Sequence, residues 1–271
     1  MVNDSERGYY AALHAPGSRK GVGDAGAFLV EMENVRRQHG FTLIETALVL
    51  VVIGLALGGI LKGQELITAA RVRNIATQLN GVKLAYLGFK DRYRQFPGDL
   101  PDDIANANIP GNPGGCGPTT HVPVFCGNGV IDPAENLVVW AQLSRANFII
   151  GTYTGVAGPA QAFTVTPTAA TNPVNPFDGY LMLVKDSDYS DVANTTPVAK
   201  MNIKSGGNVP PGVLAELDRK LDDGFAGTGD YRLAPVWNNA TDSCYTGSLG
   251  STTLAYAAAA PVTTCGAAVL Q

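Results

Sequence analysis

The hydrophobic positions of this 271-residue chain form one long block near its start and a scattered, turn-interrupted pattern after residue 95. The sixteen residues from Thr46 to Leu61 carry no charge, which gives a helix of roughly 24 Å at about 1.5 Å per residue. A start at Phe41 lengthens the block to twenty-one residues and about 32 Å, enough for the roughly 30 Å hydrocarbon core of a bilayer. The block therefore predicts a membrane-spanning helix that includes one carboxylate, Glu45.

The helical pattern continues beyond the apolar block. Apolar or aromatic residues recur at alternating spacings of four and three, which places them on one face of an amphipathic helix: Ile75, Leu79, Val82, Tyr86, Phe89 and Tyr93. The simplest prediction is a single helix over 41–93 that ends before Pro97 and Gly98. Its second half would offer an apolar stripe for a head domain to cover.

After residue 95 the pattern predicts loops, two further helices and several strands. We expect loops over 96–131, and then a helix over 132–149 with Asp132 as N-cap, Pro133 at the first position and Trp140 pointing inward. Strands are expected over 161–169, over 178–188 and near the C-terminus, and a short helix over 210–224. A long helix followed by antiparallel strands predicts the α+β class.

Charge divides the chain into a basic rod and an acidic head. Residues 41–95 carry three acidic and seven basic residues, whereas residues 96–271 carry fifteen acidic and seven basic residues. A nucleic-acid-binding protein usually presents a basic face, so we expect no nucleic-acid partner for this head. Arg36 and Arg37 precede the apolar block, which by the positive-inside rule keeps that end in the cytoplasm.

Three interpretations of the apolar block are open. A cleaved secretory signal would have an uncharged core, whereas this one contains Glu45. The second interpretation is a plain single-span membrane anchor, in which Glu45 would be incidental and would have no function. The third interpretation rests on the sequence "GFTLIE" from Gly40 to Glu45, which follows basic residues, precedes an unbroken apolar run, and closely resembles the N-terminus of type IV prepilins and type II secretion pseudopilins.

The resemblance implies a cut by prepilin peptidase between Gly40 and Phe41, N-methylation of Phe41, and a role for Glu45 in assembly. It also implies a pilin-like α+β fold, with a long N-terminal helix packed against an antiparallel sheet head. Four regions follow: a leader over 1–40, an assembly helix over 41–65, its amphipathic continuation over 66–95 and a head over 96–271. Met32 would begin a shorter leader, so we expect residues 1–31 to be either the product of a misplaced start codon or a disordered leader.

The four cysteines predict two disulfide bonds in an exported head. Three connectivities are possible, and we favour the sequence-local one, which pairs Cys116 with Cys126 and Cys244 with Cys265. Four free thiols are the alternative. No pair has zinc-ligand spacing, and His121 is the only histidine after Gly40, so neither a zinc site nor a catalytic triad is expected. We therefore expect a protein that is not an enzyme and has no cofactor, with calcium as the one possible exception.

The calcium candidate is an acidic stretch around "DRKLDDGFAGTGD", in which Asp222, Asp223 and Asp230, with Asp218, could supply oxygen ligands. Some pseudopilins hold calcium in their C-terminal loops. The alternative is a helix end that runs into a solvated turn.

The expected function is structural: a minor or tip-type pilin that passes once through the inner membrane and then joins a pilus at the cell surface. Its expected partners are other pilin subunits, prepilin peptidase and the assembly platform. A secretion pseudopilin is the alternative, and a membrane-anchored periplasmic enzyme or binding protein is the more remote one. Arg71 and Arg73 are predicted to meet acidic heads of neighbouring subunits.

Overall fold

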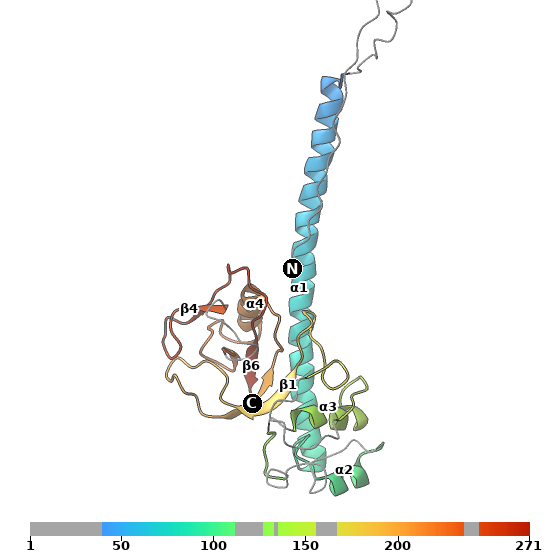
Figure 1. Ribbon diagram of the computed structural model, residues 1–271, viewed down its shortest axis with the longest axis vertical. Helices are drawn as coiled ribbons and strands as arrows, with labels where there is room; N and C mark the ends of the chain where they lie inside the picture. The colour runs from blue at the N-terminus through green and yellow to red at the C-terminus, as the bar shows by residue number, and fades with distance from the viewer. Residues whose placement is uncertain (1–39, 112–126, 133–134, 156–166, 236–243) are drawn as a thin grey trace, which may run out of the picture. The chain divides into compact units, whose positions relative to one another are not determined.

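The computed structural model describes residues 40–111, 127–132, 135–155, 167–235 and 244–271. By their contacts the residues separate into two compact units, Met1–Ala56 and Leu57–Gln271, which are described separately below. The longest element, α1 (Leu43–Tyr93), has 51 residues (Figure 1). The prediction of a single helix from about Phe41 to Tyr93 is confirmed, and the helix begins two residues after Phe41.

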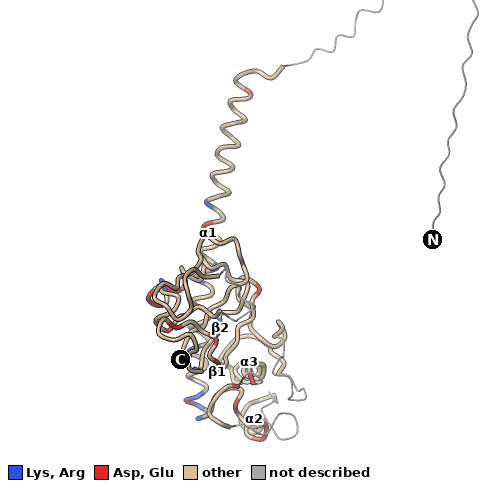
Figure 2. The backbone as a smooth tube through the Cα atoms, turned by 60° about the vertical axis from the view of Figure 1, so that its left-hand side comes forward, with Lys and Arg blue, Asp and Glu red and all other residues tan. Residues whose placement is uncertain are grey.

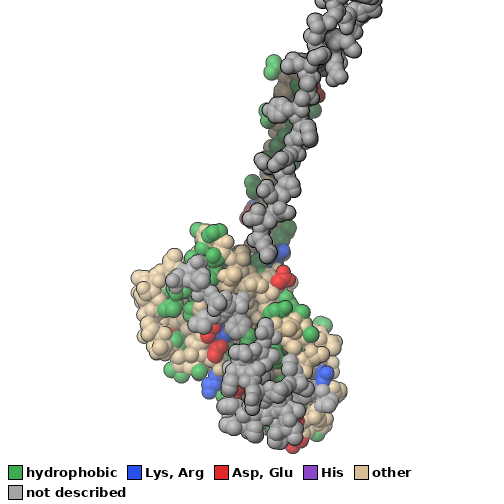
Figure 3. All heavy atoms as spheres, viewed as in Figure 1, with side chains coloured by type: hydrophobic (Ala, Val, Ile, Leu, Met, Phe, Trp, Pro, Cys, Tyr) green, Lys and Arg blue, Asp and Glu red, His purple; other side chains and the backbone are tan. Residues whose placement is uncertain are grey.

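In the first unit, the part of α1 up to Ala56 consists of exposed residues. Its large apolar side chains, among them Leu43, Ile44 and Leu50, are all exposed in the single chain. Of the helices in the described part of the chain, α1 is the one that is long and apolar enough to cross a membrane. Figure 3 shows hydrophobic side chains along this helix wherever other atoms leave it visible. Such a surface requires lipid or other protein around it.

The second unit contains an antiparallel sheet with the strand order β1-β2-β6-β3. Its strands are β1 (Met182–Asp186), β2 (Lys200–Lys204), β6 (Ala267–Leu270) and β3 (Tyr231–Leu233). The C-terminal strand lies between β2 and β3, so the sheet is complete only when the last residues are in place. A smaller pair joins β4 (Tyr245–Thr246) and β5 (Ala255–Tyr256). The expected class, α+β with an antiparallel sheet, is confirmed.

The core of the second unit forms around one face of α1, and the predicted apolar stripe is confirmed. The buried residues of this helix are Val72, Ile75, Leu79, Val82, Ala85, Tyr86 and Phe89, and Tyr93 is half-buried. Gly88 leaves room for a ring of the head, since a Cβ there would lie 2.9 Å from Cε1 of Phe148. This ring in turn meets Phe89 edge-on at 5.8 Å between ring centroids. The head is therefore built onto the second half of the helix.

The described residues of this unit also form three shorter helices: α2 (Asp102–Asn108), α3 (Asn136–Arg145) and α4 (Pro211–Leu221). The first was not predicted, because the Gly- and Pro-rich sequence around it favours loops. Its own signals are Pro101 at the N-cap and two acidic residues in the first turn. The predicted helix over 210–224 is confirmed as α4, and the strand predicted over 178–188 is confirmed as β1. The strand predicted over 161–169 falls largely outside the described residues.

The prediction that Asp132 caps the second helix was wrong. The N-cap of α3 is Glu135, whose carboxylate accepts the Asp132 backbone N–H at 2.8 Å. The Asp132 carboxylate accepts instead from the Asn128 side-chain amide at 2.9 Å. Glu135 therefore occupies the N-cap position without a side-chain hydrogen bond to the helix, because its carboxylate reaches back to Asp132 instead. The inward placement of Trp140 is confirmed, and Pro133 lies outside the described residues.

Candidate processing and assembly site

The residues of the predicted cleavage site lie outside the helix. Gly40, Phe41 and Thr42 are exposed and have no regular secondary structure, and Phe41 has 78% of its surface accessible. The Thr42 carbonyl accepts the first helical hydrogen bonds, from the N–H groups of Glu45 at 3.1 Å and Thr46 at 3.2 Å. Its hydroxyl also accepts the Glu45 N–H at 3.3 Å. Thr42 is therefore the N-cap of α1.

Glu45 is the third residue of α1, and its carboxylate is exposed. A negative charge in the first turn is favourable because unpaired N–H groups give the helix N-terminus a partial positive charge. The carboxylate makes no hydrogen bond or ion pair with the described residues, whereas Glu65 on the same helix pairs with Lys62 at 2.5 Å. Glu45 is therefore available to a cation outside its own chain or at a newly formed N-terminus.

In the second unit, the side of α1 that faces away from the head carries Arg73, Thr77, Gly81, Leu84 and Leu87. Leu84 is 70% and Leu87 is 47% exposed, although both are large and apolar. Figure 2 shows basic residues along this part of the chain and acidic residues on the loops of the head. This face has the character of an interface rather than of a solvated surface.

Two basic side chains of α1, one of them the Arg71 that was predicted to meet a neighbouring subunit, already contact rings of their own chain. The Arg71 guanidinium lies 5.2 Å from the centroid of the Phe177 ring, and the Lys90 ammonium lies 4.5 Å from that of Phe96. Such cation–π contacts hold the side chain near the head. Arg73 forms no such contact in the described part of the protein, so it is the better candidate for an intermolecular partner.

A disulfide bond joins Cys244 to Cys265, which confirms one half of the predicted pairing. Cys265 exchanges two backbone hydrogen bonds with Val209, immediately before α4, and Ala257 donates to the Cys244 carbonyl at 3.0 Å. The bond therefore holds the β4–β5 segment against the start of α4. Cys116, Cys126 and His121 lie outside the described residues.

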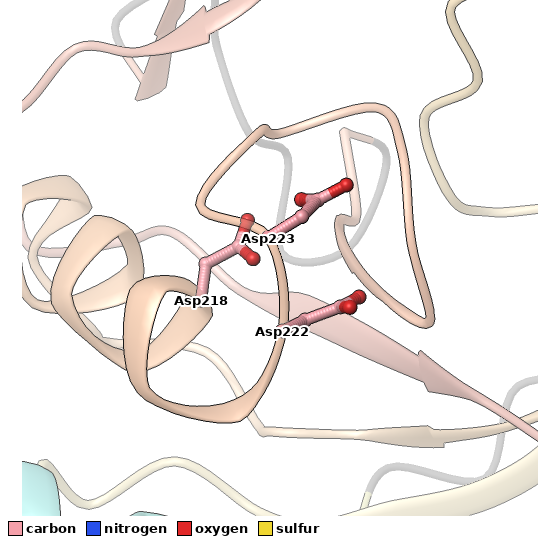
Figure 4. Close-up of side chains that lie close together, drawn as sticks. All are labelled: Asp218, Asp222 and Asp223. Carbon is pink, nitrogen blue, oxygen red and sulfur yellow. The ribbon is translucent and has the colours of Figure 1, made fainter.

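The acidic cluster consists of Asp218, Asp222 and Asp223, with one carboxylate oxygen of each within 4.8 Å of the others. Figure 4 shows Asp218 on the last turn of α4 and the other two on the following loop. Asp230, which was expected among the ligands, instead approaches through its backbone N–H, which donates to the Asp222 carboxylate. The Asp223 carboxylate accepts from the Thr228 hydroxyl at 2.5 Å and from the Phe225 N–H at 2.9 Å. These bonds hold the loop closed.

Asp218 is buried, unlike its two acidic neighbours. It accepts the Gly224 N–H at 3.0 Å and the Tyr256 hydroxyl at 2.8 Å. Burial raises the pKa of this carboxyl to about 6, and the hydrogen bonds from Tyr256 and Gly224 oppose the shift. Burial also raises the pKa of Tyr256 well above its usual value. Three carboxylates could hold a hard cation such as calcium, which prefers six to eight oxygen ligands.

Two further groups of buried titratable side chains were not foreseen from the sequence. Burial raises the pKa of Glu135 to about 8, against the hydrogen bond from Asp132, and also raises the pKa of Asp99. The Asp99 carboxylate accepts the N–H groups of Asn128 at 3.0 Å and Gly129 at 2.8 Å. On β2, the Lys204 side chain is fully buried and its ammonium lies 2.9 Å from the Asp186 carboxylate. Residue type alone predicts solvent exposure for these charges.

Comparison with known proteins supports the first turn of α1 as the site. Residues 35–61 match the family described as the prokaryotic N-terminal methylation motif, about a tenth of the chain. No curated protein and no solved structure matched the chain. The chain therefore carries a prepilin-type motif of the kind found in type IV pilins and pseudopilins, and this motif implies processing by prepilin peptidase and assembly with pilin subunits. The long apolar helix and the antiparallel head are consistent with a pilin-like fold.

Proposed function

We propose that this protein is a structural subunit of a type IV pilus filament, in a minor or tip position, and that it is not an enzyme. The observation that carries the proposal is the methylation motif at the start of a 51-residue helix. The apolar part of this helix is exposed in the single chain, while its amphipathic part forms the core of a head. A subunit that must leave the membrane and enter a helical assembly needs both parts.

In this proposal the chain first passes once through the inner membrane, with Arg36 and Arg37 on the cytoplasmic side. The peptidase cuts between Gly40 and Phe41, the new amine is methylated, and the head lies in the periplasm. The Glu45 carboxylate then pairs with an N-terminal amine, its own or that of a neighbour. In the low-dielectric core of a filament an unpaired charge is costly, so this pairing would set the axial register of each subunit.

The minor or tip position is favoured by the size of the head, 96–271, and by its disulfide-bounded C-terminal loop. A pseudopilin of a type II secretion system is the alternative, because the same motif and helix would serve a secretion filament. A membrane-anchored periplasmic enzyme or binding protein is the remote alternative. Against that alternative, the chain has three histidines in all and its sequence contains no nucleophile motif.

The deciding experiment is mass spectrometry of the protein isolated from cells. The proposal predicts a mature chain that begins at Phe41 and carries one methyl group on its amine. An uncut N-terminus, or a cut within the helix near Gly58, would contradict it. Electron microscopy with an antibody against the head would then separate the tip position from the shaft and from a secretion complex.

We also propose, independently, that the acidic cluster binds calcium. Its ligands would be Asp218, Asp222 and Asp223, and Asp230 would not be a ligand. Its support is the proximity of three carboxylates. Calcium titration of the purified protein, followed by its melting temperature, tests it. A rise that Asp222→Asn and Asp223→Asn abolish is expected, with Asp103→Asn as the control, and an unchanged melting temperature would contradict it.

A further inference from the structure

We propose that Thr42 is a positioning residue for the cleavage reaction, because it fixes where α1 begins and so keeps the Gly40–Phe41 bond outside the helix. This inference rests on the proposed function, since it concerns the same peptidase cut. The motif marks the cleavage site, whereas the role of Thr42 follows from its two hydrogen-bonding oxygens in the structure.

The first hydrogen bonds of α1 show that Thr42 sets the position at which the helix begins. Among the described residues, the first N–H of α1 that donates to a backbone carbonyl is that of Glu45, and its acceptor is Thr42. The same N–H also reaches the Thr42 hydroxyl at 3.3 Å. Thr42 and Glu45 therefore have the spacing of a capping box, in which a threonine stands three residues before a glutamate. The cap stops the helix at this residue, so Gly40 and Phe41 have no helical conformation.

The chemistry of the cut explains why this matters. Water adds to the Gly40 carbonyl carbon, the bond to the Phe41 nitrogen breaks, and this nitrogen leaves as an amine after it takes up a proton. Gly40 keeps the new carboxylate. If the helix began two residues earlier, the Gly40 carbonyl would accept the Ile44 N–H in the regular i to i+4 pattern. The carbonyl under attack would then be held in a helical turn, and the bond could not lie extended in a peptidase.

Without the Thr42 hydroxyl, two other residues could cap the helix. Gly40 is as good an N-cap as threonine, and a cap there adds two residues to the helix. A cap at Thr46 instead unwinds one turn and leaves backbone N–H and C=O groups of the apolar segment without partners, which is costly away from water. The helix should therefore extend to Gly40 and draw the scissile bond into its first turn.

The test compares three variants of the full-length precursor in detergent micelles. Thr42→Val keeps the shape of the side chain but removes the acceptor, and Thr42→Ser keeps the acceptor. Thr46→Val is the matched control, because the Thr46 hydroxyl lies within the same helix and donates to the Leu43 carbonyl at 3.0 Å. Two quantities are measured: the initial rate of cleavage by purified prepilin peptidase, and the amide exchange of Ile44 before the peptidase is added.

We expect Thr42→Val to be cut about five-fold more slowly, the factor that a typical N-cap is worth, and its Ile44 amide to exchange more slowly than in the wild type. Thr42→Ser and Thr46→Val should match the wild type in both measurements. A wild-type rate for Thr42→Val, a slow rate for Thr42→Ser, or unchanged Ile44 exchange in Thr42→Val would each overturn the inference. If the wild-type precursor itself is not cut after Gly40, the proposed function fails with it.

Discussion

The Tyr256 hydroxyl donates a hydrogen bond of 2.8 Å to the buried carboxylate of Asp218, and so ties the small β4–β5 pair to the last turn of α4. The disulfide bond between Cys244 and Cys265 holds the same segment from its other end. The C-terminal loop is thus fastened by one covalent bond and one buried polar contact, and the polar contact depends on pH.

Asp218→Asn should remove part of the pH dependence of the head's stability. Burial raises the folded-state pKa of this carboxyl from 3.8 to about 6, so between these pH values the folded protein binds more protons than the unfolded chain. Stability from this group is therefore fully present below about pH 4 and is lost as pH rises through 6, by up to about 3 kcal/mol. Melting temperatures at pH 4 to 7 should fall less steeply in the variant. A slope equal to that of the control, exposed Asp103→Asn, would contradict this prediction.

Two glycines of α1 should respond in opposite directions to the same substitution. Gly81→Ala meets nothing within 4 Å and should stabilise the protein by about 0.5–1 kcal/mol through the lower backbone entropy of the unfolded chain. In Gly88→Ala the new Cβ would lie 2.9 Å from the Phe148 ring, so the variant should lose about 1–3 kcal/mol to overpacking. Chemical denaturation of the two variants measures both values. Stability changes of the same sign in the two variants would contradict the close contact between Gly88 and the Phe148 ring.

Glu45→Gln should separate processing from assembly. The side chain stays polar and of equal size, so the peptidase should still cut after Gly40. Without the charge it cannot pair with an N-terminal amine, and the yield of sheared filaments should fall at least about ten-fold, as expected when one partner of a buried pair is lost. Glu65→Gln is the control, since Glu65 is also an exposed acid of α1 and already pairs with Lys62. Equal filament yields from the two variants would rule out the role of Glu45 in assembly.

Arg73→Glu should impair assembly and leave the head folded, because Arg73 contacts no ring or acid in the described part of the chain. Arg71→Glu should do more: it also removes the contact with Phe177 and should destabilise the head by about 0.5–1 kcal/mol. Filament yield and melting temperature together distinguish the two effects. Normal filament yield from Arg73→Glu would contradict the proposed attraction between the basic helix and acidic heads.

Much of the helix could be predicted because its signals are local and periodic. The apolar stripe from Ile75 to Phe89 can be recognised from the helical period of 3.6 residues alone. The motif from Gly40 to Glu45 can be recognised because its residues are consecutive in the sequence. The N-cap of α3 shows where such reasoning ends. Asp132 has the side chain that is favoured at an N-cap, yet its carboxylate accepts the Asn128 amide in place of helix N–H groups, and the N-cap position of α3 falls on Glu135. Sequence position gives no measure of that competition.

The sequence by itself determined the long apolar helix, the methylation motif, the α+β class and the contrast between a basic segment over 41–95 and an acidic one over 96–271, because each depends on composition or on short-range spacing. Only the tertiary structure decided which charges are buried and which are available. Asp218, Glu135 and Lys204 look like surface charges in the sequence, yet all three are buried in the fold. Burial depends on which distant segments cover a residue, and the chain order does not state those contacts.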